Sequence, residues 1–286
     1  MTNRLGLIGG SGLYKMPALA GGEWIDIDTP WGAPSDALLI GEIAGRDVAF
    51  LPRHGRGHRI APDEINYRAN IAALKSAGCT EILALSAVGS FREDLPPGSF
   101  VLVDQYVDRT LRGGRSFFGD GIVAHAGLGE PTCSRLGESV AGALAALGLP
   151  HHIGGTLLVI EGPQFSTRAE SLINRAAGID LVGMTGLPEA RLAREAELCY
   201  ASVAMVTDYD SWADQHVDVA EVIRVAGENV ANAQALVAEV AARTAPVGRC
   251  TAGCDHALEN AVITAREVWP EASRRRLATL APRIFG

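Results

Sequence analysis

Hydrophobic positions along the chain fall into short runs that end at glycine or at other small residues. Continuous apolar and β-branched runs of this length are typical of strands that are buried on both faces of a sheet. They predict seven strands, at residues 4–8, 47–51, 81–85, 100–103, 157–160, 181–184 and 201–206.

Between several of these runs, residues rich in Ala, Leu, Arg and Glu repeat with a helical period. They predict helices at residues 66–77, 133–147, 166–177, 188–197, 219–242 and 255–264. Strands that alternate with helices indicate an α/β fold with a central mixed sheet. We expect a single domain over residues 1–245, with residues 246–286 as a helical C-terminal extension of it and Arg274–Arg276 as a solvated tail.

The composition narrows the class of protein. A chain of 286 residues that is 48% hydrophobic can bury a large core. No apolar run approaches the roughly 20 residues of a membrane helix, and the start MTNRLGLIGG lacks the order of a signal peptide, so we expect a cytoplasmic protein. The formal net charge of −8 argues against a general nucleic-acid binder. An anionic ligand therefore needs local positive groups.

Such groups gather directly after the second predicted strand. Residues 52–59 read Pro-Arg-His-Gly-Arg-Gly-His-Arg and carry five side chains that can be cationic. The planar guanidinium of Arg53 suits bidentate contact with phosphate, and His54 can donate to the same dianion. A solvated basic loop is the alternative. The glycines at 55 and 57 favour an anion site because they permit close backbone approach.

Two more segments could complete an anion site. Gly9-Gly10-Ser11-Gly12 follows the first predicted strand, where backbone N–H groups and a hydroxyl can cradle an anion. It matches neither a dinucleotide fingerprint nor a P-loop. Ser86 and Ala87 stand at the carboxyl end of another strand, where open α/β sheets bind ligands. A plain turn and tight helix packing are the respective alternatives.

Candidates for contact with a flat base lie further along the chain. Phe165 precedes a helix whose cap we expect to be Ser166, and it could stack on a base or belong to the core. Asp208 and Asp210 are two residues apart, so in an extended segment they point to the same side. A partly desolvated carboxyl group can hold or share a proton, as protonation of a purine leaving group requires. A helix cap is the alternative for Asp210.

Taken in order, the segments GGSGL, RHGRGH, INYRANI, LSAVGS, DQYVDRT, EGPQFSTRAE, GMTGLPEA and TDYDSW resemble the methylthioadenosine phosphorylase branch of the trimeric purine nucleoside phosphorylase family. The match runs from about Leu5 to Asn229. The resemblance implies one α/β domain around a twisted mixed sheet. It also implies cleavage of 5′-methylthioadenosine by phosphate to adenine and 5-methylthioribose 1-phosphate, in purine and methionine salvage. Phosphate is then a co-substrate, and no metal or organic cofactor is expected.

The resemblance assigns site residues as well. Those that would hold phosphate are Ser11, Arg53, His54, Ser86, Ala87 through its backbone, and Thr185. Those that would contact the nucleoside are Met184 at the ribose, Phe165 at the purine, and Ser166, Asp208 and Asp210 at the base edge. Asp208 and His54 would be the catalytic pair.

The family resemblance further implies a homotrimer, or a dimer of trimers. His125 matches the position that reaches into the neighbouring subunit's pocket for the 5′ group. Val219, Val222 and Ile223 would form the apolar wall of that pocket, and an ordinary buried helix face is the alternative for these three.

Some choices stay open. The segment Gly-Met-Thr-Gly that begins at Gly183 also resembles relatives that prefer 6-oxopurines such as methylthioinosine. Those relatives, however, carry Asn-Pro where this chain has Thr207 to Asp210. A carboxylate can accept a hydrogen bond from a 6-amino group, which favours adenine. An apolar pocket separates 5′ substituents by only ~1–3 kcal/mol, so other 5′-modified nucleosides could be accepted. A nucleoside hydrolase and a nonenzymatic nucleoside-binding protein are the remaining alternatives.

The chain has five cysteines. Cys79, Cys133 and Cys199 lie in apolar stretches and are interpreted as small core residues. Cys250 and Cys254 lie close together near His256, but the sequence shows no second ligand pair beside them, so we expect no metal. The resemblance implies that cysteines in such an extension sometimes form a disulfide, so these two are either paired or free.

Overall fold

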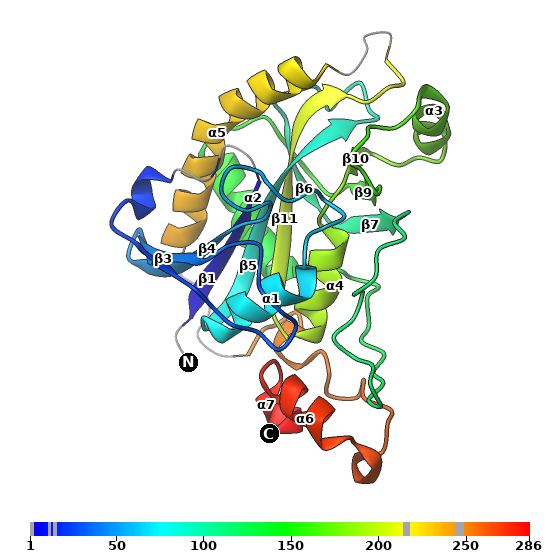
Figure 1. The fold of residues 1–286 in the computed structure, drawn as a ribbon. Helices are drawn as coiled ribbons and strands as arrows, with labels where there is room; N and C mark the ends of the chain where they lie inside the picture. Colours follow the sequence, from blue (N-terminus) through cyan, green and yellow to red (C-terminus); the bar gives the residue numbers. More distant parts are fainter. Residues whose placement is uncertain (1–2, 11–12, 14–15, 214–217, 244–248) are drawn as a thin grey trace.

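A computed structural model describes residues 3–10, 13, 16–213, 218–243 and 249–286. Its centre is a mixed sheet in which four strands run parallel: β4 (Arg46–Pro52), β1 (Arg4–Gly9), β5 (Cys79–Ser90) and β11 (Cys199–Tyr209). Figure 1 shows β5 and β11 as the two long strands at its middle.

Shorter strands extend the sheet at both ends. Beyond β4 lie β3 (Leu38–Ile43) and β2 (Glu23–Ile25). Beyond β5 lie β10 (Leu181–Gly183), β9 (Thr156–Val159) and β7 (Gln105–Asp108). A branch from β11 holds β6 (Phe100–Val103) and β8 (His151–Ile153).

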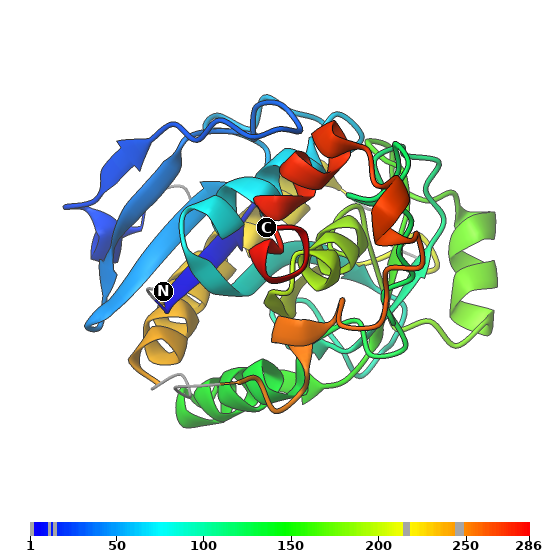
Figure 2. The ribbon, with the colours of Figure 1, turned by 90° about the horizontal axis from the view of Figure 1, so that it is seen from below.

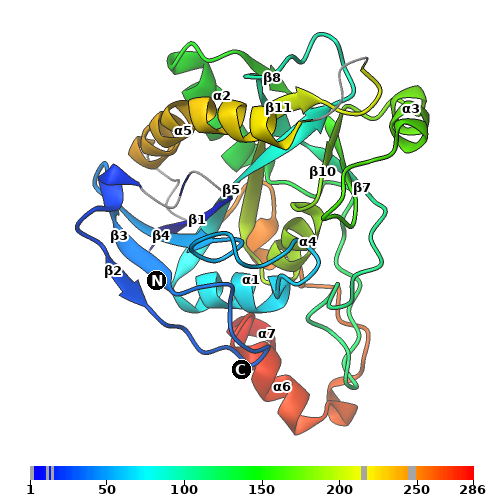
Figure 3. The same cartoon turned by 45° about the horizontal axis from the view of Figure 1, so that its top comes forward.

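Helices cover both faces of the sheet because the central strands are apolar on both. In β1, Leu5 and Leu7 pack in the cluster that includes α2 (Ser134–Ala146) and α5 (Val219–Ala242). The alternate residue Ile8 packs with α1 (Tyr67–Ser76) and α4 (Leu187–Glu195) on the other face. Figure 3 shows α5 and α1 on opposite sides of β1 and β5. The single α/β domain with a mixed sheet is thus confirmed.

The C-terminal residues 249–286 pack under α1 and α4, as Figure 2 shows from below. They contain the short helices η2 (Cys254–His256), η3 (Arg266–Val268), α6 (Glu271–Ala278) and α7 (Pro282–Phe285). Leu258, Leu277 and Phe285 join the same core cluster as α1. Glu197 also holds this segment, since its Oε1 accepts from the backbone N–H of Leu258 at 3.1 Å and from Arg283 at 2.6 Å.

All seven predicted strands are present, and the long helix has the predicted bounds. The helix predicted at 255–264 is wrong. Only a single 3-10 turn forms there, because the following backbone instead pairs with another segment: His125 N–H donates to Ala261 and Ile263 N–H donates to Val123. The strands β2, β3, β7 and β8 were not predicted.

Two smaller expectations are also corrected. Arg274–Arg276 is no solvated tail but part of α6, where Arg274 and Arg275 pair with Glu271. The cap of α3 (Arg168–Ala176) is Thr167, not Ser166, because Thr167 and Glu170 form a reciprocal capping box. Within the described ranges, no helix has both the length and the apolar character needed to cross a bilayer.

Candidate active site

The site is built where the pairing of β5 changes. On one side β5 pairs with β1 only as far as Leu85, and it meets β10 only from Gly89 onward. The other side is occupied by β11 along this whole length. Residues 86–88 therefore have no strand partner on the β1 side. This is the kind of topological switch at which open α/β sheets bind ligands.

Arg53 lies beside this gap and is only 1% exposed. Its Nε donates to Glu189 Oε1 at 2.5 Å and its Nη2 to Oε2 at 3.1 Å, while Nη1 donates to the carbonyl of Leu85 at 2.9 Å. Burial alone would lower the pKa of Arg53, but the Glu189 charge outweighs it and the pKa is raised. Glu189 thus takes the Nε/Nη2 edge of the guanidinium, one of its two edges that can bind an oxyanion bidentately. One N–H on each Nη is left without a partner among the described residues.

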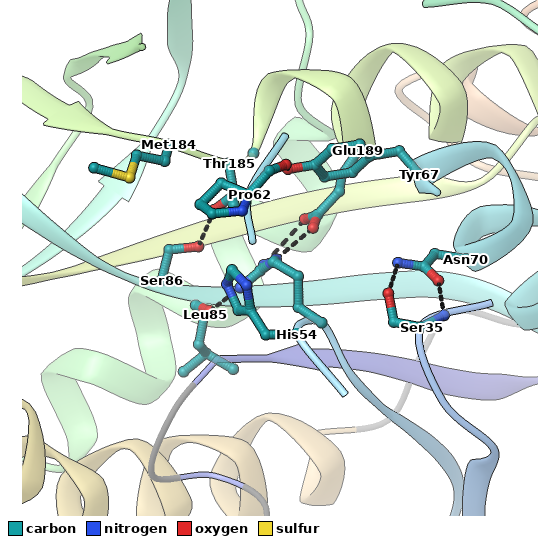
Figure 4. A network of polar contacts seen from close by, with 12 residues as sticks. Ser35, His54, Pro62, Tyr67, Asn70, Leu85, Ser86, Met184, Thr185 and Glu189 are labelled. Carbon is teal, nitrogen blue, oxygen red and sulfur yellow. Dashed lines mark hydrogen bonds and ion pairs between the residues drawn. The ribbon is translucent and has the colours of Figure 1, made fainter. Parts of the chain in front are cut away.

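His54 lies next to Arg53 and its ring is largely buried (Figure 4). Burial, together with the charge on Arg53, lowers the pKa of His54 to about 4, so the ring is neutral at pH 7. Its Nδ1 lies 2.9 Å from the carbonyl oxygen of Ile60, and since a carbonyl only accepts, Nδ1 carries the proton. Nε2 is therefore an acceptor. This differs from the expectation that His54 donates to a phosphate dianion.

The other cations of the basic loop do not join the site. Arg56 and Arg59 both pair with Asp36 nearer the surface. His58 stacks on the His54 ring at a centroid distance of 4.3 Å. Of the five cationic side chains, Arg53 and His54 turn inward. Arg56, His58 and Arg59 are exposed, so the solvated-loop alternative holds for these three.

Two hydroxyls face each other across the gap. Ser86 Oγ and Thr185 Oγ1 lie 3.2 Å apart, both in buried residues (Figure 4). Ala87, next along β5, is exposed. Ser11 lies outside the described residues, although a Cβ on its neighbour Gly10 would come 3.8 Å from Nη1 of Arg53. The structure therefore brings together Arg53, Ser86, Ala87 and Thr185.

Met184 follows β10 and its position is fixed by two contacts. Its carbonyl accepts from Nη1 of the buried Arg112 at 2.7 Å. Its side chain lies so close to Gly162 that a Cβ there would come 2.5 Å from the sulfur. Gly162 also has φ +70°, so a side chain is disfavoured twice.

Asp208 and Asp210 end β11 on the same side of the strand, as their spacing predicts. Both border Gly89, where a Cβ would lie 3.1 Å from Asp208 Oδ2 and 3.4 Å from Asp210 Cβ. A register shift between Val206 and Asp208 sets this alignment. Burial and, to a smaller extent, the charge of Asp210 raise the pKa of Asp208 to about 6, although the Thr207 hydroxyl, which donates to Asp208 at 2.7 Å, opposes them. Burial also raises the pKa of Asp210.

Phe165 is 43% exposed, so it is not the core residue that its local pattern favoured. Ser166 follows it, and its carbonyl accepts from the Ser211 hydroxyl at 2.8 Å. The side-chain oxygens Ser166 Oγ and Asp210 Oδ2 are buried but have no hydrogen-bond partner of good geometry in the described part of the chain. The hydroxyls of Ser171 and Ser166 still act on Asp210 and oppose the rise of its pKa, so these three groups form one polar cluster.

The four residues assigned to the 5′ group are not enclosed by this chain. Val219 is 57% exposed and Ile223 66% exposed, so the buried-face alternative is wrong for both, and Val222 is half-buried. His125 is exposed on a loop whose Ala124 bridges to Val262 of the C-terminal segment. Within the described chain, Val219, Ile223 and His125 are thus left largely uncovered.

Glu189, Tyr200 and Arg112 are site residues that sequence reasoning missed. Tyr200 OH lies 2.9 Å from Glu189 Oε2, so it helps to hold the carboxylate that holds Arg53. Glu189 is part of the segment GMTGLPEA. An acidic residue on the apolar face of a helix was the available signal, because that face is buried in α4.

A separate cleft of about 740 Å³ lies elsewhere, lined by residues such as Leu102, Asp104, Cys133, Arg194 and Ala252. None of the predicted site residues lines it. The groups suited to an anion lie in the interaction network of Figure 4, and the aspartates suited to a base lie beside Gly89; none of them lines this open cleft.

The fold and the site together define a class of protein, and comparison with known proteins gives the same class. The model of the phosphorylase superfamily matches residues 4–242, so the chain belongs to that superfamily. Its relatives include the S-methyl-5′-thioadenosine phosphorylase of Cereibacter sphaeroides, 52% identical over 93% of this chain and 92% of the relative. The enzyme of that name from Rhodospirillum rubrum is 49% identical over 99% and 97%.

Solved structures show the same similarity. A methylthioadenosine phosphorylase from an antarctic soil metagenomic library has a TM-score of 0.89 and 41% identity, with 98% of each chain covered. The methylthioadenosine phosphorylase of Schistosoma mansoni in complex with adenine has a TM-score of 0.80 and 40% identity, with 84% of this chain and 91% of that chain covered. The family resemblance of the sequence motifs is confirmed.

The raised pKa of Asp208 has a cost in stability. Because the folded carboxyl group binds its proton more tightly than the unfolded one, the free energy of unfolding falls as pH rises from about 4 to about 6, and stays lowered above that. Asp208→Asn should remove this penalty and stabilise the protein by about 1 to 3 kcal/mol at pH 8. Urea unfolding at pH 8 and pH 5 measures it, with the exposed Asp63→Asn as control. A gain of equal size at both pH values, or none at pH 8, would contradict the assignment.

Proposed function

We propose that this chain cleaves 5′-methylthioadenosine with inorganic phosphate, giving adenine and 5-methylthioribose 1-phosphate. One observation carries the assignment of both substrates to one site. Ser86 and Gly89, the residue that both aspartates border, lie three residues apart on β5, and the aspartates themselves come from the end of the neighbouring β11. At a rise of about 3.3 Å per residue this is about 10 Å, a span suited to a nucleoside with phosphate below its ribose.

Phosphate would lie in the gap beside residues 86–88. The two unpaired N–H groups of Arg53, the hydroxyls of Ser86 and Thr185 and the backbone at Ala87 would donate to its oxygens, and Ser11 belongs to the same proposal. His54 Nε2 would accept a hydrogen bond from the hydroxyl of hydrogen phosphate, because the ring proton is on Nδ1, which donates to the carbonyl of Ile60. Glu189 keeps the guanidinium in one orientation, so little conformational freedom is lost on binding.

The nucleoside would lie between this phosphate and the aspartates. Met184 would contact the ribose, Phe165 would stack on the purine, and Ser166 and Asp210 would bind the base edge. As the glycosidic bond lengthens, phosphate oxygens stabilise the positive charge on the sugar and Asp208 shares its proton with N7. Phosphate then bonds to C1′ with inversion while the bonding pair leaves with adenine. With a pKa of about 6, Asp208 is suited to hold a proton near neutral pH.

The aspartates also bear on the choice of base. A carboxylate accepts a hydrogen bond from a 6-amino group, whereas a 6-keto group offers it no donor. The methylthioadenosine phosphorylase of Schistosoma mansoni was solved in complex with adenine and in complex with tubercidin. Adenine is therefore our choice, and methylthioinosine is the alternative that Gly183 keeps open.

We propose a homotrimer in which a neighbouring subunit covers the 5′ group, with a dimer of trimers as the larger alternative. Support comes from Val219 and Ile223, two large apolar side chains left exposed at the start of α5. Val222 belongs to the same wall, and His125 would reach it from the neighbour. A cytoplasmic location is part of the same proposal, and neither a metal nor an organic cofactor takes part in the reaction.

The reaction is tested by release of base from 5′-methylthioadenosine with and without phosphate, with methylthioinosine and adenosine in parallel. We expect release from the first substrate only when phosphate is present, because phosphate is the nucleophile. Release without phosphate would identify a hydrolase. Binding without turnover would identify a nucleoside-binding protein, and a preference for methylthioinosine would overturn the choice of adenine.

The role of Asp208 is tested with Asp208→Asn in the same assay. We expect kcat/KM for 5′-methylthioadenosine to fall by about 10²–10⁴-fold, because the amide cannot share a proton with N7. Methylthioinosine should lose less, since an amide can donate to its 6-keto oxygen. Equal losses for the two substrates, or a near-normal rate in Asp208→Asn, would contradict the proposed contact.

A further inference from the structure

Four of the five cysteines, from three separate parts of the sequence, have their side chains close together in the buried core. The sulfur atoms of Cys133, Cys199, Cys250 and Cys254 all lie within 4.8 Å of one another. Cys133 precedes α2 and Cys199 begins β11, so two sulfurs belong to the main sheet and its helices. The other two belong to the C-terminal segment. Sequence alone could not show this second pair of ligands beside Cys250 and Cys254.

The distances between the sulfur atoms distinguish a disulfide from a zinc site. Cys250 Sγ lies 3.5 Å from Cys199 Sγ and 3.8 Å from Cys133 Sγ. A disulfide needs about 2.05 Å, and all five cysteines are free thiols here, so the disulfide between Cys250 and Cys254 is absent. Four thiolates around zinc, each at about 2.3 Å in a tetrahedron, have sulfurs about 3.8 Å apart.

The groups around the four sulfurs also suit a metal site with a net negative charge. Zn²⁺ with four thiolates carries a net charge of −2, which burial makes costly unless donors or cations are near. Arg135 Nη2 lies 3.3 Å from Cys199 Sγ, and Arg194 Nη1 lies 3.7 Å from Cys254 Sγ. Arg135 also pairs with the buried Glu81, and Arg46 pairs with that same carboxylate, so one positive charge remains in excess beside Cys199. Donors to the ligands are the expected second layer of a metal site.

We propose that Cys133, Cys199, Cys250 and Cys254 bind one zinc ion, which fastens the C-terminal segment to the main sheet. The four thiols lose their protons on binding, and no redox step is involved. With all four positions filled by protein, the ion is structural. The open cleft described above is lined by Cys133, Arg194 and Ala252, which gives the ion an access route.

The ion would order more than the cysteines. Residues 261–263 follow Cys254 closely and pair with the loop that carries His125, through His125 N–H to Ala261 and Ile263 N–H to Val123. The zinc site would thus hold that loop indirectly. This inference rests on the cysteine geometry and is independent of the proposed reaction.

The first test is the metal content of the purified full-length protein, dialysed after incubation with Zn²⁺ and a thiol reductant. We expect one zinc ion per chain by mass spectrometry of the elements, in the wild type and in Cys79→Ser. Cys79 is the matched control because it is also buried but lies outside the cluster. In Cys250→Ser and Cys254→Ser the zinc content should fall at least about tenfold, since three thiolates leave the site open.

A second measurement needs no variant. The wild type is purified without reductant, incubated with Zn²⁺, dialysed and then denatured. Its free thiols and its released zinc are then counted in the same sample. Five thiols with one zinc ion support the site. A single thiol without zinc would show two disulfides, and five thiols without zinc, after incubation with the ion, would show four plain core cysteines; both outcomes overturn the proposal.

Discussion

The buried ion pair between Arg53 and Glu189 is the interaction on which the site depends. It joins the loop after β4 to α4, beside the place where β1 and β10 part from β5. A guanidinium buried to 1% exposure is tolerated only with a carboxylate partner; it also donates to the carbonyl of Leu85, and the Tyr200 hydroxyl donates to the Glu189 carboxylate. With its position fixed in this way, Arg53 keeps two N–H groups for an anion, and burial together with the charge on Arg53 keeps the imidazole of His54 neutral.

The second constraint is the desolvation of Asp208. At neutral pH a buried carboxyl group with a pKa near 6 lowers the free energy of unfolding relative to an amide in its place. Only the carboxyl group, however, can exchange a proton with a base. Ser86 of the proposed phosphate site lies on β5 and the aspartates lie at the end of the paired strand β11, so the spacing between these groups follows from the pairing of the two strands. Functional groups on rigid strands hold the geometry that such chemistry needs.

Much of the fold was readable from the sequence, because strands buried on both faces leave continuous apolar runs such as Leu5 to Ile8. The site residues were found through local motifs, but their partners were not. Glu189 lies 136 residues from Arg53, and local patterns hold no information on such pairing. The same holds for Cys133 and Cys199, which look like core residues until the fold brings them to Cys250 and Cys254. The helix expected at 255–264 failed because tertiary pairing with residues 123–125 outweighed local propensity.

The most direct test of the site is calorimetric binding of inorganic phosphate to the wild type and to the double variant Arg53→Met/Glu189→Met. Replacing both charges by apolar side chains of similar size leaves no buried charge unpaired, so the variant should stay folded, which its thermal unfolding checks. We expect its phosphate affinity to be at least about tenfold weaker than that of the wild type, because the charge-assisted donors are gone. A folded double variant that binds phosphate as tightly as the wild type would contradict the account.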